Sequence, residues 1–185
     1  MLLVGPRGIG KTHLLCLTRH YVGRRLSARA GWVLPSDAWV CPFFTEEEFA
    51  GQNSLANFLI TLFAKLREES PHEPRFHLPA HLPNETDQQV VDCCFERLQQ
   101  FHAESKKRVL LVIDNLQKIL QQWTDAEHYR LRGFLSNDGG VVILGSAPSV
   151  FREVLDQKAA FHNFFEPRIL TELTTPRILE LLKRR

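Results

Sequence analysis

Residues 1–15 of this 185-residue chain read MLLVGPRGIGKTHLL, and within them GPRGIGKT (residues 5–12) fits the pattern G-x-x-x-x-G-K-[ST]. This pattern is typical of a loop whose backbone N–H groups cradle the phosphates of a nucleotide, between a strand and a helix. Leu2 to Val4 supply a short apolar run before the loop. Apolar residues with helical spacing follow it: Leu14, Leu15, Leu17, Tyr21 and Val22. The sequence therefore predicts strand, phosphate loop and helix, with these five residues sharing one broad face of the helix.

Each residue type in the loop has its own chemical role. Gly5, Gly8 and Gly10 let the backbone turn tightly, so that N–H groups point at the phosphates and the helix adds its positive end. Lys11 would neutralise the β and γ oxygens, and the Thr12 hydroxyl would ligate Mg²⁺. We expect the nucleotide to contact a continuous run of residues: Gly5, Pro6, Arg7, Gly8, Ile9, Gly10, Lys11, Thr12 and His13.

Strand-like and helix-like segments alternate along the rest of the chain. Two apolar runs, at 108–114 and 141–144, have the pattern of strands buried on both faces of a parallel sheet, and further strands are expected at 39–44 and 161–170. Helical spacing is found at 54–66, 86–106 and 127–135, and in the segments that open with Pro148 and Pro176. The alternation predicts an α/β fold, a three-layer α/β/α sandwich around a mainly parallel five-stranded sheet.

The composition is that of a globular protein with balanced charge, since 23 Lys and Arg face 21 Asp and Glu. A nucleic-acid surface normally shows clustered basic charge, so we do not expect nucleic acid to bind through this domain alone. No apolar run reaches the ~18 residues of a membrane helix, and the four cysteines lack C-x-x-C spacing. We therefore expect a cytoplasmic protein with reduced thiols and no membrane contact. Residues 69–84 carry four prolines and should form a surface connection.

Asp114 closes the apolar run VLLVID (residues 109–114). In phosphate-loop folds an aspartate at this point lies beside the loop and holds a water of the Mg²⁺ shell. An aspartate after a buried strand can also be a simple turn residue. Because the loop motif is present as well, we favour the metal role and take Thr12 and Asp114 as the metal ligands.

The next residue is Asn115, where many such ATPases carry a glutamate that orients and deprotonates the attacking water. An amide can orient water through its carbonyl oxygen but is a very poor base. Three hypotheses stay open. The protein binds ATP and hydrolyses it hardly at all; Asn115 positions the water while phosphate itself takes the proton; or another carboxylate substitutes.

A substitute carboxylate is available in Thr45-Glu46-Glu47-Glu48, directly after the strand expected at 39–44. If that strand neighbours the one ending at Asp114, one of these glutamates, for which we name Glu47, could face the γ-phosphate. The competing interpretation is that three consecutive glutamates cap a helix N-terminus and face solvent.

Ser146 is the third candidate catalytic residue, beside Glu47 and Asn115. It follows the apolar run VVIL, where a small polar residue could sense the γ-phosphate or hold the water, although serine is also an everyday turn residue. Arg7, Arg152 and Arg168 are candidates for stabilising phosphate charge, but no spacing rule places them, and we favour an ordinary surface arginine at each position.

Four segments in this order resemble the AAA+/STAND-like ATPase domains of bacterial and archaeal regulatory proteins: GPRGIGKTHLL, VLLVIDNLQ, VVILGSAPSVF and FFEPRILTELT. The resemblance covers nearly the whole chain, and the first two segments are its specific motifs. It implies a P-loop NTPase fold with the phosphate-loop strand at the centre of five, ATP with Mg²⁺, and nucleotide-driven change of assembly or partner contact. By position, residues 5–12 match the phosphate loop, Asp114 the metal-side aspartate and Ser146 the polar residue ending the fourth strand.

The chain departs from that family pattern at three points. Asn115 replaces the usual acidic residue, which puts hydrolysis in question. The chain starts almost at the first strand, without the upstream segment that usually contacts the adenine, and it ends where TTPRILELLKRR (residues 174–185) looks like the opening of a helical lid. We therefore expect an ATPase core at 1–172 and the start of a truncated lid at 173–185.

Three functions are compatible with these features. The first is an ATP-dependent regulatory switch, in which slow conversion of ATP to ADP times a change of protein partner or self-association. The second is a nucleotide-stabilised scaffold that never turns over, which Asn115 favours. The third is a small-molecule kinase or a DNA-associated helper ATPase, although we find no basic lid for an acceptor and no basic stripe for DNA.

Overall fold

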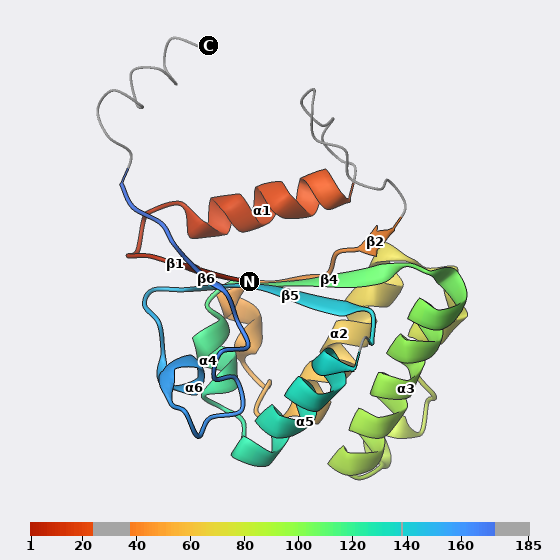
Figure 1. Cartoon of the computed structure of the whole chain (residues 1–185). Coiled ribbons are helices and arrows are strands. Elements are labelled where there is room, and N and C mark those ends of the chain that lie inside the picture. Colours follow the sequence, from red (N-terminus) through yellow and green to blue (C-terminus); the bar gives the residue numbers. More distant parts are fainter. Residues whose placement is uncertain (24–37, 138, 173–185) are drawn as a thin grey trace.

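The computed structural model describes residues 1–23, 38–137 and 139–172 (Figure 1). Six strands form one sheet: β1 (Leu2–Val4), β2 (Trp39–Val40), β3 (Phe43–Phe44), β4 (Arg108–Ile113), β5 (Val141–Ala147) and β6 (Pro167–Ile169). Their order is β2-β4-β5-β1-β6, with β3 also paired to β4, and each pairing is parallel. Because β2 and β3 share one side of β4, the sheet has five strand positions.

Helices cover both faces of this sheet. Helix α1 (Lys11–Val22) lies on one face, and the other described helices lie on the opposite face (Figure 1). These are α2 (Leu55–Glu69), α3 (Asp87–Ser105), α4 (Leu116–Leu120), α5 (Asp125–Ser136) and α6 (Arg152–Leu155). Short 3₁₀ turns η1 (Glu46–Phe49), η2 (Pro74–Phe76) and η3 (Leu82–Asn84) lie in the connections. The prediction of a three-layer fold around a parallel sheet is confirmed. No described helix is long and apolar enough to cross a membrane.

Several elements begin where local chemistry places them. The Ser54 hydroxyl accepts a hydrogen bond from the Asn57 N–H at the start of α2, and Thr86 caps α3 in a reciprocal pair with Gln89. Such caps satisfy N–H groups that the helix itself leaves unpaired. The expected strand at 39–44 is instead two short strands, because Pro42 has no N–H to donate to the ladder between them. The phosphate-loop strand β1 lies between β5 and β6, one position from the centre.

Other expectations needed correction. The connection at 69–84 is not purely superficial, since Phe76 and Leu82 are buried in the core. Pro148 lies before α6 rather than inside it, and 161–165 form turns and a bend, so the last strand begins only at Pro167. The short helix α4 follows Asn115 without an apolar period long enough to predict it. The expected lid residues 173–185 lie outside the described residues.

The two faces of the sheet are packed very differently. A large core fills the space between the sheet and helices α2 to α5, and its centre is a run of aromatic contacts joining Phe44, Phe58 and Trp123, with ring centroids 4.8 Å and 5.2 Å apart. Between α1 and the sheet the buried cluster is small, and it consists of Leu3, Leu15, Val112 and Leu144. The predicted broad apolar face of α1 is wrong, because Leu15 is buried but Leu14 is 39% exposed.

The register of β4 with its neighbours places polar residues at one edge of the sheet. Phe44 pairs with Ile113, and the Asp114 N–H donates to the Phe44 carbonyl at 3.0 Å. On the other side Ile113 pairs with Gly145, and β5 in turn pairs Ala147 with Val4 of β1. Because the carboxyl ends of parallel strands meet at one edge, the residues after β1, β3, β4 and β5 converge there.

The four cysteines are free thiols. Cys41 and Cys94 are buried, and Cys16 and Cys93 are half-buried. Burial raises the pKa of the Cys41 and Cys94 thiols to about 12. Both therefore stay protonated at neutral pH and are poor nucleophiles.

Replacing Phe58 tests the aromatic centre of the core. Its side chain is 1% exposed, and Phe58→Ala leaves a cavity beside Phe44 and Trp123. We expect a loss of about 3–5 kcal/mol in the free energy of unfolding, measured by urea denaturation. Arg67→Ala, on the exposed side of the same helix, should change it by less than about 0.5 kcal/mol. Equal effects would contradict this description of the core.

Candidate functional site

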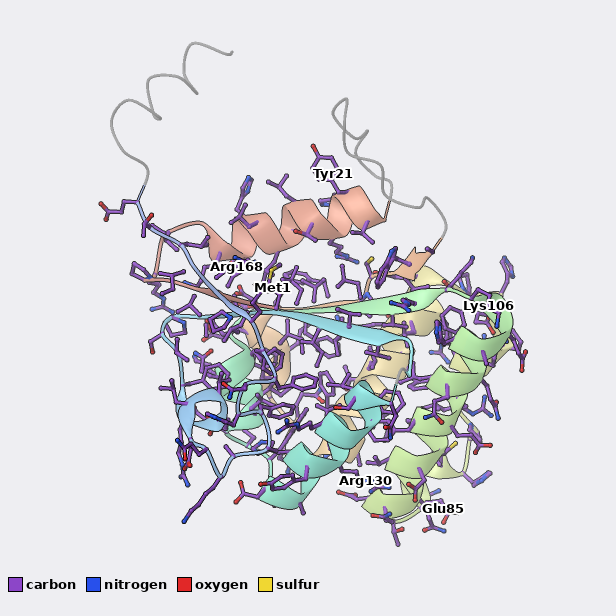
Figure 2. The ribbon with its side chains drawn as sticks, viewed as in Figure 1. Met1, Tyr21, Glu85, Lys106, Arg130 and Arg168 are labelled. Carbon is purple, nitrogen blue, oxygen red and sulfur yellow. The ribbon has the colours of Figure 1, made fainter. Side chains whose placement is uncertain are left out.

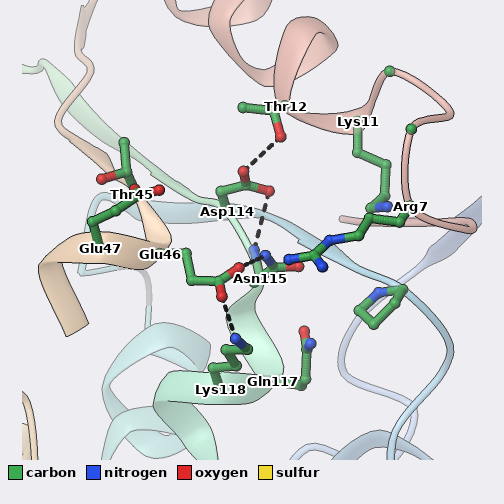
Figure 3. Close-up of a pocket in the computed structure, with 13 residues that line it drawn as sticks. Arg7, Lys11, Thr12, Thr45, Glu46, Glu47, Asp114, Asn115, Gln117 and Lys118 are labelled. Atoms are coloured by element: carbon green, nitrogen blue, oxygen red, sulfur yellow. Dashed lines mark hydrogen bonds and ion pairs between the residues drawn. The ribbon is translucent and has the colours of Figure 1, made fainter. Parts of the chain in front are cut away.

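A pocket of about 670 Å³ opens at the edge of the sheet where the strand ends converge (Figure 3). Its size lies in the range of small-molecule and cofactor sites. The residues that line it come from the phosphate loop, from the starts of α1, η1 and α4, and from the positions that follow β4 and β5: Arg7, Gly8, Gly10, Lys11, Thr12, Thr45, Glu46, Glu47, Asp114, Asn115, Gln117, Lys118 and Pro148. The two motifs at residues 5–12 and 109–117 therefore meet in one cavity.

Backbone conformation explains the glycines of the loop. Gly8 and Gly10 have φ values of 84° and 97°, in a region that residues with a Cβ rarely adopt. Gly5 is favoured for a different reason, because a Cβ there would lie 3.1 Å from the Leu170 carbonyl oxygen and from Ile9, closer than ordinary contact. The loop conformation thus needs glycine at positions 8 and 10 and favours it at position 5.

Lys11 is folded into the loop that precedes it. Its ammonium donates hydrogen bonds to the carbonyl oxygens of Gly5, at 2.7 Å, and Pro6, at 2.9 Å, and the residue is only 8% exposed. A buried ammonium needs such acceptors. Phosphate oxygens entering the pocket would supply stronger, charged acceptors for the same group.

Asp114 is held from two directions. The Thr12 hydroxyl donates to Asp114 Oδ2 at 2.6 Å, and the Ser146 hydroxyl donates to Asp114 Oδ1. Ser146 lies on β5, between β4, which Asp114 follows, and β1, which precedes the phosphate loop, and it is fully buried. The serine hydroxyl also accepts a hydrogen bond from the Asn115 N–H at 3.0 Å. Ser146 thus holds the Asp114 carboxylate from the buried side, within the sheet, and is not among the residues that line the pocket.

Asn115 reaches across the pocket to η1. Its backbone is left-handed, with φ 52°, a conformation that asparagine tolerates better than most residues. The side-chain Nδ2 donates to a carboxylate oxygen of Glu46, and the other oxygen of Glu46 pairs with the Lys118 ammonium (Figure 3). The Lys118 hydrogen bond, followed by those of Asn115 and the charge of Arg7, lowers the pKa of Glu46 although partial burial acts in the opposite direction. Glu46 is therefore ionised at neutral pH.

The other two glutamates of this segment have different surroundings. Glu48 accepts hydrogen bonds from the N–H and hydroxyl of Thr45 and pairs with Lys65, so it caps η1 as the competing interpretation expects. Glu47 lines the pocket but makes no hydrogen bond or ion pair with any residue that the structure describes. The capping interpretation thus holds for Glu48, while Glu46 and Glu47 face the cavity.

Some residues named from the sequence line the pocket and others do not. Arg7, Gly8, Gly10, Lys11, Thr12, Asp114, Asn115 and Glu47 line it. Gly5, Pro6, Ile9, His13 and Ser146 do not, nor do Arg152 and Arg168, which pair with Asp156 and Glu166. Sequence reasoning missed Gln117, Lys118 and Pro148. A signal for Lys118 exists, since it stands one helical turn after Asn115, but only the β3–β4 register brings it to Glu46.

The neighbouring oxygens of Thr12 and Asp114 fit a hard cation. Mg²⁺ prefers oxygen ligands and usually takes only one or two from the protein, the rest being phosphate oxygens and waters. No cluster of three or more His, Cys, Asp or Glu that could hold a metal occurs in the described part of the chain. The pair therefore suits a cation that arrives with a phosphate ligand, rather than one held by protein alone.

Comparison with known protein families identifies one match. The family described as "AAA domain" matches residues 1–155, which include the phosphate loop, Asp114 and Ser146. No curated protein sequence matches the chain.

Comparison with solved structures finds the same fold. The ORC2 protein of Aeropyrum pernix, solved as ADPNP–ADP complexes, has a TM-score of 0.62 at 17% identity, over 99% of this chain and 44% of that one. A Walker-type ATPase of Pyrococcus abyssi has a TM-score of 0.60 at 15% identity, over 100% of this chain and 52% of that one. The Aeropyrum pernix ORC1 protein, solved in complex with DNA, has a TM-score of 0.57 at 18% identity, over 100% of this chain and 42% of that one. The chain thus spans about half, or less, of the length of these proteins.

Removing the Ser146 hydroxyl tests the support of Asp114. Ser146→Ala leaves an oxygen of the carboxylate and the Asn115 N–H without this partner. We expect a loss of about 1–3 kcal/mol in the free energy of unfolding, because a buried hydrogen bond to a carboxylate is lost, while the Asn115 N–H keeps Asp114 Oδ1 as its acceptor at 3.1 Å. Thr12→Ala removes a hydrogen bond to the same carboxylate from an exposed residue, so we expect a smaller loss of about 0.5–1 kcal/mol. A larger loss for Thr12→Ala, by denaturant titration, would contradict this view.

Proposed function

We propose that this chain, which belongs to the AAA domain family, binds ATP with Mg²⁺ in the pocket at the carboxyl ends of its strands and hydrolyses it slowly. The observation that carries the proposal is the contact between Thr12, at the end of the phosphate loop, and Asp114, at the end of β4. Two motifs 102 residues apart in sequence supply the oxygen ligands of one cation. Within the family we propose the STAND-like regulatory type, acting as a nucleotide-dependent switch.

The phosphate loop would hold the β and γ phosphates. The left-handed turns at Gly8 and Gly10 and the start of α1 present backbone N–H groups and the positive end of a helix. Lys11 would exchange its two carbonyl partners for phosphate oxygens, and Arg7 adds a second positive charge at the pocket wall. Residues 5–13 would form the rest of this contact surface.

Thr12 and Asp114 would hold the metal side of the site. When bound, Mg²⁺ neutralises charge on the β and γ phosphates. Ser146 fixes one oxygen of Asp114, so the carboxylate is already oriented toward the loop. For Ser146 we therefore propose a positioning role, in addition to the γ-phosphate sensing considered from the sequence.

Hydrolysis is expected to be slow because the residue after Asp114 is Asn115. Its amide is held by Glu46 and cannot accept a proton as a carboxylate does. Slow turnover suits a switch whose ATP and ADP states last long enough to select a protein partner or a second copy of the chain. The alternative is a nucleotide-held scaffold that does not turn over, and only turnover separates the two.

Lys11→Ala tests nucleotide binding. The ammonium is the buried positive charge of the loop, and its loss should weaken ATP binding at least tenfold, or ~1.4 kcal/mol. The measurement is titration of a fluorescent ATP analogue in the presence of Mg²⁺. Lys65→Ala, which removes a lysine outside this pocket, should leave the affinity unchanged. Undiminished ATP affinity in Lys11→Ala would overturn the assignment of the loop.

Phosphate release from ATP and Mg²⁺ at several protein concentrations tests the switch. We expect turnover above the Lys11→Ala blank, and a rate per chain that rises with concentration if self-association completes the site. ATP binding without any turnover would instead favour the scaffold. Duplex DNA added to the same assay tests the DNA-associated alternative, for which we expect no stimulation, because the chain carries balanced charge.

A further inference from the structure

The contact between Asn115 and Glu46 places a carboxylate opposite the end of β4. Strand β3 pairs with β4 in parallel register, so η1 begins beside the residue that follows Asp114. Glu46 thus lines the same pocket as Lys11 and Thr12, and the Asn115 amide holds it there (Figure 3). The pocket therefore contains a carboxylate near the position where Asn115 itself provides none.

We propose that Glu46 orients and deprotonates the water that attacks the γ-phosphate, and that Asn115 is the residue that positions Glu46. This inference rests on the proposed function, since it concerns the same ATP site. It names the group that makes turnover possible despite the amide after Asp114. Glu47, the candidate named from the sequence, is the competing assignment.

The backbone at Asn115 gives a physical reason for this arrangement. A residue with φ 52° is left-handed, and Asn and Asp adopt that conformation more readily than residues with longer side chains. A glutamate at position 115 would be strained in this turn. A carboxylate that enters from η1 avoids the strain, while the Asn115 amide fixes it by a hydrogen bond.

The contacts of Glu46 decide its charge and its access to water, although the lowered pKa also makes the carboxylate a weaker base. Lys118, Asn115 and Arg7 keep the carboxylate ionised, so it is ready to accept a hydrogen bond from water. Its ion pair with Lys118 is partly open to solvent, the lysine side chain being 50% exposed and the glutamate 28%. Such exposed pairs contribute little to stability, so one oxygen of Glu46 can exchange Lys118 for water at small cost.

The step balances as ordinary ATP hydrolysis. The water oxygen forms a bond to the γ-phosphorus, and the bond between that phosphorus and the β–γ bridging oxygen breaks. The bridging oxygen keeps the electron pair and leaves as part of ADP. One water proton passes to the Glu46 carboxylate and from there to solvent, which restores the residue for the next cycle.

Glu46→Gln is the primary test, because it keeps the size of the side chain and one of its two acceptor oxygens but removes the proton acceptor. We expect turnover to fall about 100-fold or more, with ATP affinity unchanged within about threefold, or ~0.7 kcal/mol. The measurements are steady-state phosphate release and titration of a fluorescent ATP analogue on the full chain. Glu85→Gln, at the far end of the α2–α3 layer from the sheet (Figure 2), is the matched control. Its turnover and its ATP affinity should equal those of the unsubstituted chain.

A second variant separates a chemical role from a structural one. Asn115→Asp in the Glu46→Gln background exchanges amide and carboxylate across the same hydrogen bond, with a residue that still tolerates the left-handed turn. We expect turnover to recover at least tenfold over Glu46→Gln alone. Asn115→Ala in the otherwise unchanged chain should lower kcat while KM stays the same, because it releases Glu46 without touching the phosphate loop.

Each result has a defined meaning. Turnover retained in Glu46→Gln, or lost only in Glu47→Gln, would overturn the inference and leave the proposed function standing. No recovery in the exchanged variant would also count against it. No turnover in the unsubstituted chain with ATP binding intact would overturn the water-activating role and the slow hydrolysis, and would leave nucleotide binding by a scaffold. Absence of Lys11-dependent ATP binding would overturn the proposed function itself.

Discussion

The parallel register of β4 is the constraint on which the rest of the site depends. Its partners are β3 on one side and β5 on the other, and Ile113 is paired with both Phe44 and Gly145. This pairing fixes the positions at which the chain leaves the sheet after β3, β4 and β5. A shift of one residue would turn each side chain of β4 to the opposite face, and Asp114 would no longer face the Thr12 hydroxyl. The large core on the helix-rich face holds that register, because Leu111 and Ile113 are buried in it.

The pocket combines charges of both signs in a way that suits a metal–polyphosphate ligand. Arg7 and Lys11 stand on the loop side, Asp114 lies beside Thr12, and Glu46 faces them from η1. The isolated chain satisfies these groups internally: Lys11 binds loop carbonyls, and Glu46 binds Asn115 and Lys118. A nucleotide would therefore compete with existing contacts, and part of its binding free energy would go into rearranging them.

The unequal faces of the sheet show how the loop is supported. On the α1 side a small cluster around Leu15 anchors the helix that begins at Lys11, and Val142 of the interior strand β5 is 40% exposed there. On the other side, aromatic contacts around Phe58 pack the helices firmly against the sheet. Regions with few buried apolar contacts open at lower free energy than dense cores. The phosphate loop thus belongs to the more lightly packed side, while Asp114 ends a strand that is packed from both faces.

The sequence by itself determined the features that follow from local chemistry. The glycines of residues 5–12 need backbone angles or close approaches that other residues resist, and the apolar run before Asp114 requires burial on both faces. These local demands are enough to predict the α/β fold, the loop and Asp114. The helical spacing at 86–106 predicted α3 (Asp87–Ser105) for the same reason.

Only the tertiary structure decided how the glutamates divide and what Ser146 does. Three consecutive glutamates carry no signal that distinguishes them. The β3–β4 pairing sends Glu46 to Asn115, and the turn of η1 returns Glu48 to Thr45. Ser146 lies beneath Asp114 because β5 is inserted between β4 and β1. The contacts of Glu46 and Ser146 join residues 31 to 72 positions apart in the chain, and such contacts follow from strand order, which no local pattern encodes.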